Sequence, residues 1–199
     1  MAARGIRDVR VLAAMASLPR HMFVPAPMRP FAYEDRPLPI GFQQTISQPF
    51  VVGWMTELLE LDGDERVLEV GTGSGYQAAL LGRLVREVFT VERIPELARR
   101  ARWLLTALGY GNVHVVDGDG SVGLPNEAPY DAILVAAATP AVPDELMAQL
   151  GPFGRLVAPV GPGALQSLRV VRRTARGISI TRQGGCIFVP LLGARGFPA

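Results

Sequence analysis

The residues with the clearest chemical meaning are three glycines at alternate positions, Gly71, Gly73 and Gly75. They follow a short apolar run that contains one acid, Glu69, and a helical pattern begins at Tyr76. A strand, a glycine turn and a helix in this order open a nucleotide-type α/β domain, and glycine lets a ligand lie against backbone N–H groups. A dinucleotide fingerprint needs its third glycine at position 76. The spacing therefore favours a loop for another cofactor over a purely structural turn.

Two acids follow later strands of the same pattern. Glu92 ends an apolar stretch, where its carboxylate can accept two hydrogen bonds from ribose hydroxyls. Asp119 precedes Gly120 in a Gly-Asp-Gly turn, where it can accept from an adenine amino group while the glycines admit the flat ring. Alone, Glu92 could be a solvated acid at a strand end, and Asp119 would be better explained as part of a plain Asp-Gly turn. Their order after the glycine loop favours a nucleoside site at the carboxyl ends of the strands.

The elements that position these residues alternate in the α/β manner from residue 66 onward. The pattern predicts strands at 66–70, 87–91, 112–116, 131–136 and 155–159, and helices at 75–85, 95–108 and 143–150. Two longer strands, 165–171 and 177–189, follow. The predicted fold is α/β, with a doubly wound, mostly parallel Rossmann-like sheet and a C-terminal strand pair.

An N-terminal extension precedes this core. Apolar spacing predicts helices at 5–18 and 49–61. The proline-rich segment 19–39 between them is expected to be irregular, with Phe23, Phe31 and Tyr33 as anchors onto the core. No linker is visible, so we expect a single domain over residues 1–199.

Composition excludes several function classes. All 20 basic residues of the 199 are arginine, which removes Schiff-base and lysine general-base chemistry. The net charge of +2 is too small to imply a nucleic-acid partner. No apolar run approaches the ~20 residues that span a bilayer, so we expect no membrane association and a cytoplasmic location. A single cysteine, Cys186, and two histidines without clustered acids support neither a disulfide framework nor a metal site.

A string upstream of the glycine loop is more specific than any of these features. Residues 45–49 read Thr-Ile-Ser-Gln-Pro. This string resembles the signature of the protein-L-isoaspartate O-methyltransferase family, and the Gly-x-Gly-x-Gly loop resembles the S-adenosylmethionine loop of methyltransferases. Further similar segments stand at 18–25, 32–35, 91–94, 118–120, 128–131, 143–150 and 188–191. The resemblance covers roughly residues 5–192, with two departures: Gln43 replaces a glycine usual in bacterial members, and Cys186-Ile187 replaces a valine and a polar residue.

The resemblance implies a role for each matching residue. Ser47 would be the catalytic residue that faces the substrate carboxylate. The cofactor S-adenosylmethionine would lie against Gln48, Pro49, Phe50, Glu69, Gly71, Thr72, Gly73, Ser74, Gly75, Glu92, Asp119 and Gly120. Of these, Glu92 would hold the ribose, and Asp119 with Gly120 the adenine. Residues 1–62 would carry the substrate segment, and 63–192 the cofactor-binding core of one methyltransferase domain.

The implied reaction moves a methyl group from S-adenosylmethionine to the α-carboxylate of an L-isoaspartyl residue in a damaged protein or peptide. Succinimide formation from the ester then starts repair, and S-adenosyl-L-homocysteine is the other product. A carboxyl group with a pKa near ~4 is already ionised at neutral pH, so no general base is needed. The alternatives are an S-adenosylmethionine-dependent methyltransferase for RNA or a small molecule, and a module that binds the cofactor without turnover. We expect a monomer.

Overall fold

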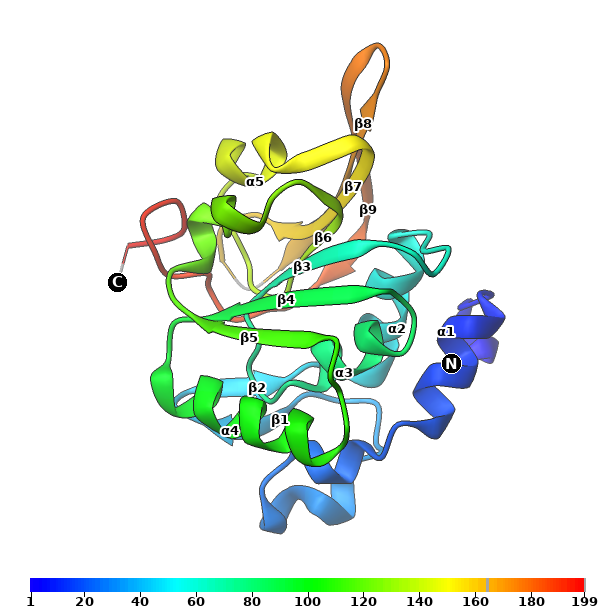
Figure 1. Cartoon of the computed structure of the whole chain (residues 1–199). Helices are drawn as coiled ribbons and strands as arrows, with labels where there is room; N and C mark the ends of the chain where they lie inside the picture. The colour runs from blue at the N-terminus through cyan, green and yellow to red at the C-terminus, as the bar shows by residue number, and fades with distance from the viewer. Residues whose placement is uncertain (164, 199) are drawn as a thin grey trace.

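The computed structural model describes residues 1–163 and 165–198, which build a seven-stranded sheet (Figure 1). Its strands are β3 (Arg66–Val70), β4 (Glu87–Glu92), β5 (Val113–Asp117), β6 (Tyr130–Val135), β7 (Leu150–Val160), β8 (Gln166–Thr174) and β9 (Gly177–Cys186). The spatial order is β5-β4-β3-β6-β7-β8-β9. Strands β3 to β7 pair in parallel, whereas β8 and β9 are antiparallel. The predicted mostly parallel sheet with a C-terminal strand pair is confirmed.

Helices cover both faces of this sheet. Helices α3 (Tyr76–Gly82) and α4 (Pro95–Ala107) lie on one side of the strands in Figure 1, and α5 (Asp144–Ala148) lies on the other. Central strands buried on both faces are mostly apolar, and the side chains of Val67, Leu68 and Val70 are fully covered. Glu69 is the buried acid of this strand. Helices α1 (Val9–Ser17) and α2 (Pro49–Leu58) belong to the same apolar cluster as α3. The prediction for residues 143–150 is too long, because β7 begins at Leu150.

The longest helix, α4, has 13 residues. Across residues 1–163 and 165–198, no helix has the length and apolar character that crossing a bilayer demands.

The N-terminal extension contains a small hairpin that the sequence did not predict. Strands β1 (Leu38–Gly41) and β2 (Gln44–Ile46) pair antiparallel through a turn at Phe42 and Gln43. Both turn residues have left-handed backbones, with φ of 52° and 59°. This conformation favours glycine or asparagine, so a turn built from phenylalanine and glutamine gives no hairpin signal.

The anchors expected in the irregular segment are only partly correct. Phe23 is buried, but Phe31 and Tyr33 are 39% and 66% exposed. The apolar contacts of this region come instead from Leu38 and Ile40, whose side chains point inward from β1.

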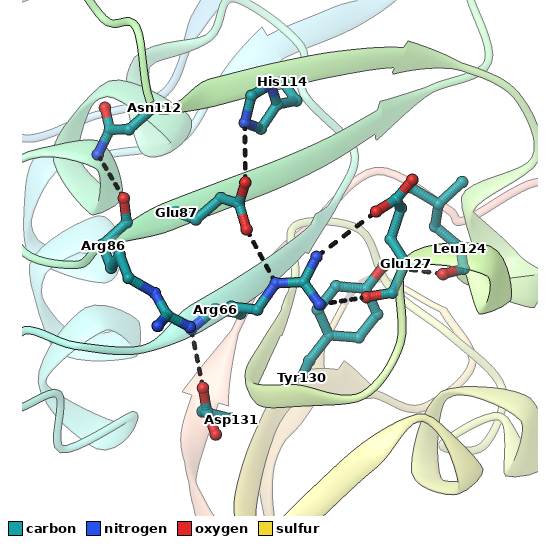
Figure 2. Close-up of polar contacts among 9 residues, drawn as sticks. All are labelled: Arg66, Arg86, Glu87, Asn112, His114, Leu124, Glu127, Tyr130 and Asp131. Atoms are coloured by element: carbon teal, nitrogen blue, oxygen red, sulfur yellow. Dashed lines mark hydrogen bonds and ion pairs between the residues drawn. The ribbon is translucent and has the colours of Figure 1, made fainter.

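A polar cluster stabilises the end of the sheet where β3 and β4 begin (Figure 2). Arg66 donates from Nε to Glu87 Oε2 at 2.8 Å and from Nη1 to the Glu127 carbonyl at 2.8 Å. Its backbone N–H donates to Asp131, and His114 lies 3.2 Å from the other Glu87 oxygen. The hydrogen bond from Arg66 lowers the pKa of Glu87. These contacts join the four strands β3, β4, β5 and β6 at the end opposite the carboxyl ends of β3 and β4.

Candidate active site

A cavity of about 140 Å³ lies at the carboxyl ends of the parallel strands. Strand β3 has β4 on one side and β6 on the other, so the strand order reverses there, as it does at the ligand sites of doubly wound sheets. The lining comes from segments 44–47, 69–74, 91–94, 134, 136–137 and 188–192, together with Val52, Met55, Tyr76, Gln77 and Gly120. Small side chains at Ala136 and Ala137 leave room beside the glycine loop.

The glycine loop forms one wall of this cavity. Gly71, which donates its N–H to the Val91 carbonyl, has φ 95°, and Gly73 has φ 53°. Both glycines line the cavity, as do Thr72 between them and Ser74 after them. Glycine is needed at these positions because L side chains rarely adopt such backbones.

Gly75 has a different place from the other two glycines. It begins α3 with φ 85°, and a Cβ there would lie 3.3 Å from Ala101 Cβ and from Leu105 Cδ1. Gly75 is absent from the cavity lining and allows α3 to pack against α4.

Glu92 closes the loop from the neighbouring strand. Its Oε2 accepts the Gly73 N–H at 2.8 Å and its Oε1 accepts the Ile94 N–H at 2.9 Å. A carboxylate has about four acceptor positions, so two remain for a ligand. Glu92 is only 6% exposed and lines the cavity, which is the position expected of a ribose-binding acid.

Glu69 is a fully buried carboxyl group in the same wall. Its Oε2 accepts from Thr90 Oγ1 at 2.5 Å, and Thr90 Oγ1 lies 2.6 Å from Thr72 Oγ1. Its Oε1 is buried without a hydrogen-bond partner among the described residues. Burial raises the pKa of Glu69 to about 8, the Thr90 hydrogen bond opposes this shift, and the nearby charge of Glu92 adds to it. The unpartnered oxygen suits a ligand that brings its own donor or positive charge.

Ser47 lies in another wall of the cavity, between the end of β2 and the start of α2. Residues 44–47 line the cavity, and the Ser47 carbonyl accepts from Arg20 Nη2 at 2.8 Å. The structure therefore brings Ser47 and the glycine loop, 24 residues later, to the same cavity.

Three expected cofactor residues after Ser47 lie outside the lining. Gln48 caps α2, and Pro49 occupies its first turn. Phe50 donates its N–H to Asp35 at 2.8 Å, and its ring stacks on Trp54. In their place α2 presents Val52 and Met55 to the cavity.

Asp119 also lies outside the lining, whereas Gly120 is in it. The Asp119 carboxylate accepts from the N–H groups of Ser121 at 2.9 Å and Ala194 at 2.8 Å. Burial alone would raise the pKa of Asp119, but these hydrogen bonds stabilise the carboxylate more strongly, so the pKa is lowered. Asp119 thus holds the C-terminal segment against the loop after β5.

Sequence reasoning missed several lining residues. The C-terminal segment 188–192 forms a wall, although its Phe-Val-Pro-Leu string gave no site prediction. Tyr76, Gln77 and Ile94 also line the cavity, and their only signal was that they lie within two residues of predicted site residues.

Residues 1–163 and 165–198 contain no group of three or more histidine, cysteine or acidic side chains arranged to hold a metal ion. Cys186 is buried, and desolvation raises the pKa of its thiol to about 11.

Comparison with known proteins gives one consistent result. The chain is 57% identical over 196 residues to a protein-L-isoaspartate O-methyltransferase of Methanoculleus marisnigri, covering 98% of this chain and 89% of that protein. A solved structure of a protein-L-isoaspartate O-methyltransferase matches with a TM-score of 0.87 at 28% identity; the match covers 98% of this chain and 64% of that one. A Plasmodium falciparum protein solved in complex with S-adenosyl-L-homocysteine shares the fold, with a TM-score of 0.83 at 24% identity over 96% and 94% of the two chains.

The sequence profile of one family spans nearly the whole chain, matching residues 1–196. The glycine loop, the Ser47 wall and the C-terminal wall all lie within this match. The chain belongs to the protein-L-isoaspartate(D-aspartate) O-methyltransferase family.

Proposed function

We propose that this chain transfers a methyl group from S-adenosylmethionine to the α-carboxylate of L-isoaspartyl residues in damaged proteins and peptides, which starts their repair through a succinimide. The observation that carries this proposal is that Ser47 and the glycine loop line the same cavity. Family membership favours this reaction over transfer to RNA or to a small molecule.

The cofactor wall fits S-adenosylmethionine, which supplies a sulfonium methyl group when bound. Gly71 and Gly73 let the ligand approach the backbone closely. A ligand ammonium group next to the free Glu69 oxygen favours the ionised carboxylate, which then accepts from it. The two remaining acceptor positions of Glu92 accept from ribose hydroxyls. Gly120 leaves a flat surface for the adenine.

The substrate wall needs only to position an anion. The isoaspartyl carboxylate is ionised at neutral pH, so no residue has to remove a proton. Consistent with this, the lining contains no histidine, cysteine or lysine among the described residues. The Ser47 hydroxyl donates to one carboxylate oxygen and aims the other at the methyl group. The negative carboxylate and the positive sulfonium neutralise each other as the methyl group moves. For such a reaction, alignment of the reacting atoms in a cavity that excludes water supplies most of the rate acceleration.

The expected cofactor residues outside the lining act indirectly in this proposal. Gln48, Pro49 and Phe50 fix the start of α2, Gly75 fixes the start of α3, and Asp119 holds the C-terminal wall. Residues 1–62 supply the substrate wall and 63–192 the cofactor core of one domain. The protein works as a cytoplasmic monomer, without nucleic acid or membrane, on isoaspartyl-containing proteins and peptides.

The test uses labelled S-adenosylmethionine and two synthetic peptides that differ only in one aspartyl or isoaspartyl linkage. Base-labile label on the isoaspartyl peptide alone is the expected result. Label on neither peptide, with the cofactor bound, would contradict the assigned acceptor.

Two substitutions test the walls separately. We expect Ser47→Ala to lower kcat at least about tenfold, because one oriented hydrogen bond is lost, and to leave cofactor affinity unchanged. Ser179→Ala, on the exposed β8–β9 hairpin, is the matched control. We expect Glu92→Ala to weaken cofactor binding about tenfold or more. Unchanged affinity by calorimetry would refute the ribose contact.

A further inference from the structure

Arg20 is a buried cation directly behind the substrate wall. Its side chain is 1% exposed, in the turn Arg20–Phe23 of the N-terminal extension. Nε donates to the Ala32 carbonyl at 2.8 Å, and Nη2 donates to the Ser47 carbonyl at 2.8 Å. One guanidinium thus joins three segments that are separate in the sequence, and one of them carries Ser47.

The charge of Arg20 has an aromatic neighbour instead of an acid. Among the described residues, no carboxylate lies within ion-pair distance, and the guanidinium carbon lies 4.7 Å from the centroid of the Tyr76 ring. Phe23 packs edge-on against the same ring at 5.4 Å. Because Tyr76 lines the cavity, Arg20 supports the cavity at two points, Ser47 in the substrate wall and Tyr76 next to the glycine loop.

This arrangement does not maximise stability. Nη1 of Arg20 is buried without a hydrogen-bond partner in the described part of the chain. A buried unsatisfied donor costs about 1–3 kcal/mol, and a buried charge without an acid costs more. The planar guanidinium of Arg20 holds two N–H donors in fixed directions, and they reach two carbonyl groups at once. Lysine and apolar side chains cannot do this.

We propose that Arg20 is a positioning residue for methyl transfer: its guanidinium fixes the Ser47 peptide and so aims the Ser47 hydroxyl at the substrate carboxylate. Arg20 acts through Ser47 and touches neither substrate nor cofactor. This inference rests on the proposed role of Ser47.

The experiment compares Arg20→Met, Arg20→Lys, Ser47→Ala and the double variant Arg20→Met/Ser47→Ala in the full chain. Arg10→Met is the matched control, because Arg10 also donates to two backbone carbonyls, those of Leu61 at 2.8 Å and Leu84 at 2.9 Å, away from the cavity. For each variant we would measure kcat and KM with an isoaspartyl peptide, cofactor affinity by calorimetry, and Tm.

We expect Arg20→Met to lower kcat about 10- to 100-fold, as a misplaced aligning group does, while cofactor affinity changes less than about threefold. Arg20→Lys keeps the charge without the fork and should lose most of the same activity. Arg10→Met should lower Tm and leave kcat unchanged. In the Ser47→Ala background, Arg20→Met should lower kcat by less than about threefold further, because the hydroxyl it aims is gone.

Several results would overturn the inference. An equal further loss in the double variant would mean that Arg20 does not act through Ser47, and full activity of Arg20→Lys would mean that the fork is irrelevant. If neither Arg20 variant folds, Arg20 is a structural residue. Full activity of Ser47→Ala would overturn the proposed role of Ser47 itself. If Ser47→Ala loses activity but Arg20→Met does not, only the positioning role of Arg20 is overturned.

Discussion

Replacing Glu69 by glutamine should change how the stability of the protein depends on pH. Glu69 is fully buried, and its pKa is raised from 4.5 to about 8, chiefly by desolvation. Between these two values the folded protein keeps a proton that the unfolded chain has released. Unfolding therefore releases a proton in this range, and the stability falls as pH rises.

The size of this effect follows from the two pKa values. The raised pKa contributes about 4 kcal/mol to the free energy of unfolding at pH 5 and less than about 1 kcal/mol at pH 8. The loss across this window is therefore about 3 kcal/mol, a large part of the stability of an ordinary domain. Glutamine has the same shape, its Oε1 can accept from Thr90, and it does not titrate.

The assay is urea unfolding of the wild type and Glu69→Gln at pH 5, 6, 7 and 8 without cofactor. The wild type minus variant difference cancels the titrating groups that do not interact with Glu69, and it should fall by about 3 kcal/mol over this range. Asp64→Asn is the control, because it makes the same acid-to-amide change at an exposed position. A Glu69→Gln difference that varies by less than about 1 kcal/mol would refute the claim that burial keeps this carboxyl protonated.

Four other substitutions test three smaller features. Gln43→Gly should stabilise the protein by about 0.5–1 kcal/mol, because it relieves a left-handed backbone, whereas Gln44→Gly on β2 should destabilise it in the same urea assay. Gly75→Ala should lower the free energy of unfolding by about 2 kcal/mol, because it strains the backbone and brings a Cβ against α4. If the folded variant binds the cofactor more weakly, Gly75 does more than allow packing. Glu87→Gln should lower the free energy of unfolding by about 1 kcal/mol at pH 7, because it weakens the ion pair with Arg66. This loss should vanish in acid, where Glu87 of the wild type is protonated, and a loss that does not depend on pH would contradict the prediction.

Features that depend on local sequence were predicted well. The strand before Gly71, the positive backbone angles of the loop and the position of Glu92 at a strand end all follow from patterns of a few residues. The sheet order adds a general rule about carboxyl ends, and this rule places Glu92 in the cavity.

Features that depend on contacts between distant segments were not predicted. Asp119 lies in the expected turn, but its hydrogen bond to Ala194 comes from the far end of the chain. Phe50 follows Ser47 closely, yet the first turn of α2 directs its ring toward Trp54 instead of the cavity. Arg20 lies in the family-like segment 18–25, but no role for it was predicted, because a buried arginine is recognisable only from the carbonyls that surround it.

The two walls of the cavity differ in how firmly they are built. The glycine loop belongs to the parallel sheet, whereas Ser47 follows a hairpin with three paired positions, Leu38 with Ile46, Pro39 with Thr45 and Gly41 with Gln44. Two-stranded hairpins are marginally stable by themselves, and such units open locally well below the free energy of global unfolding. We therefore expect the amide protons of β1 and β2 to exchange with solvent earlier than those of β3 and β6. If they do, opening of the Ser47 wall is separate from denaturation, and a damaged segment of a bulky protein could enter the cavity while the sheet stays folded.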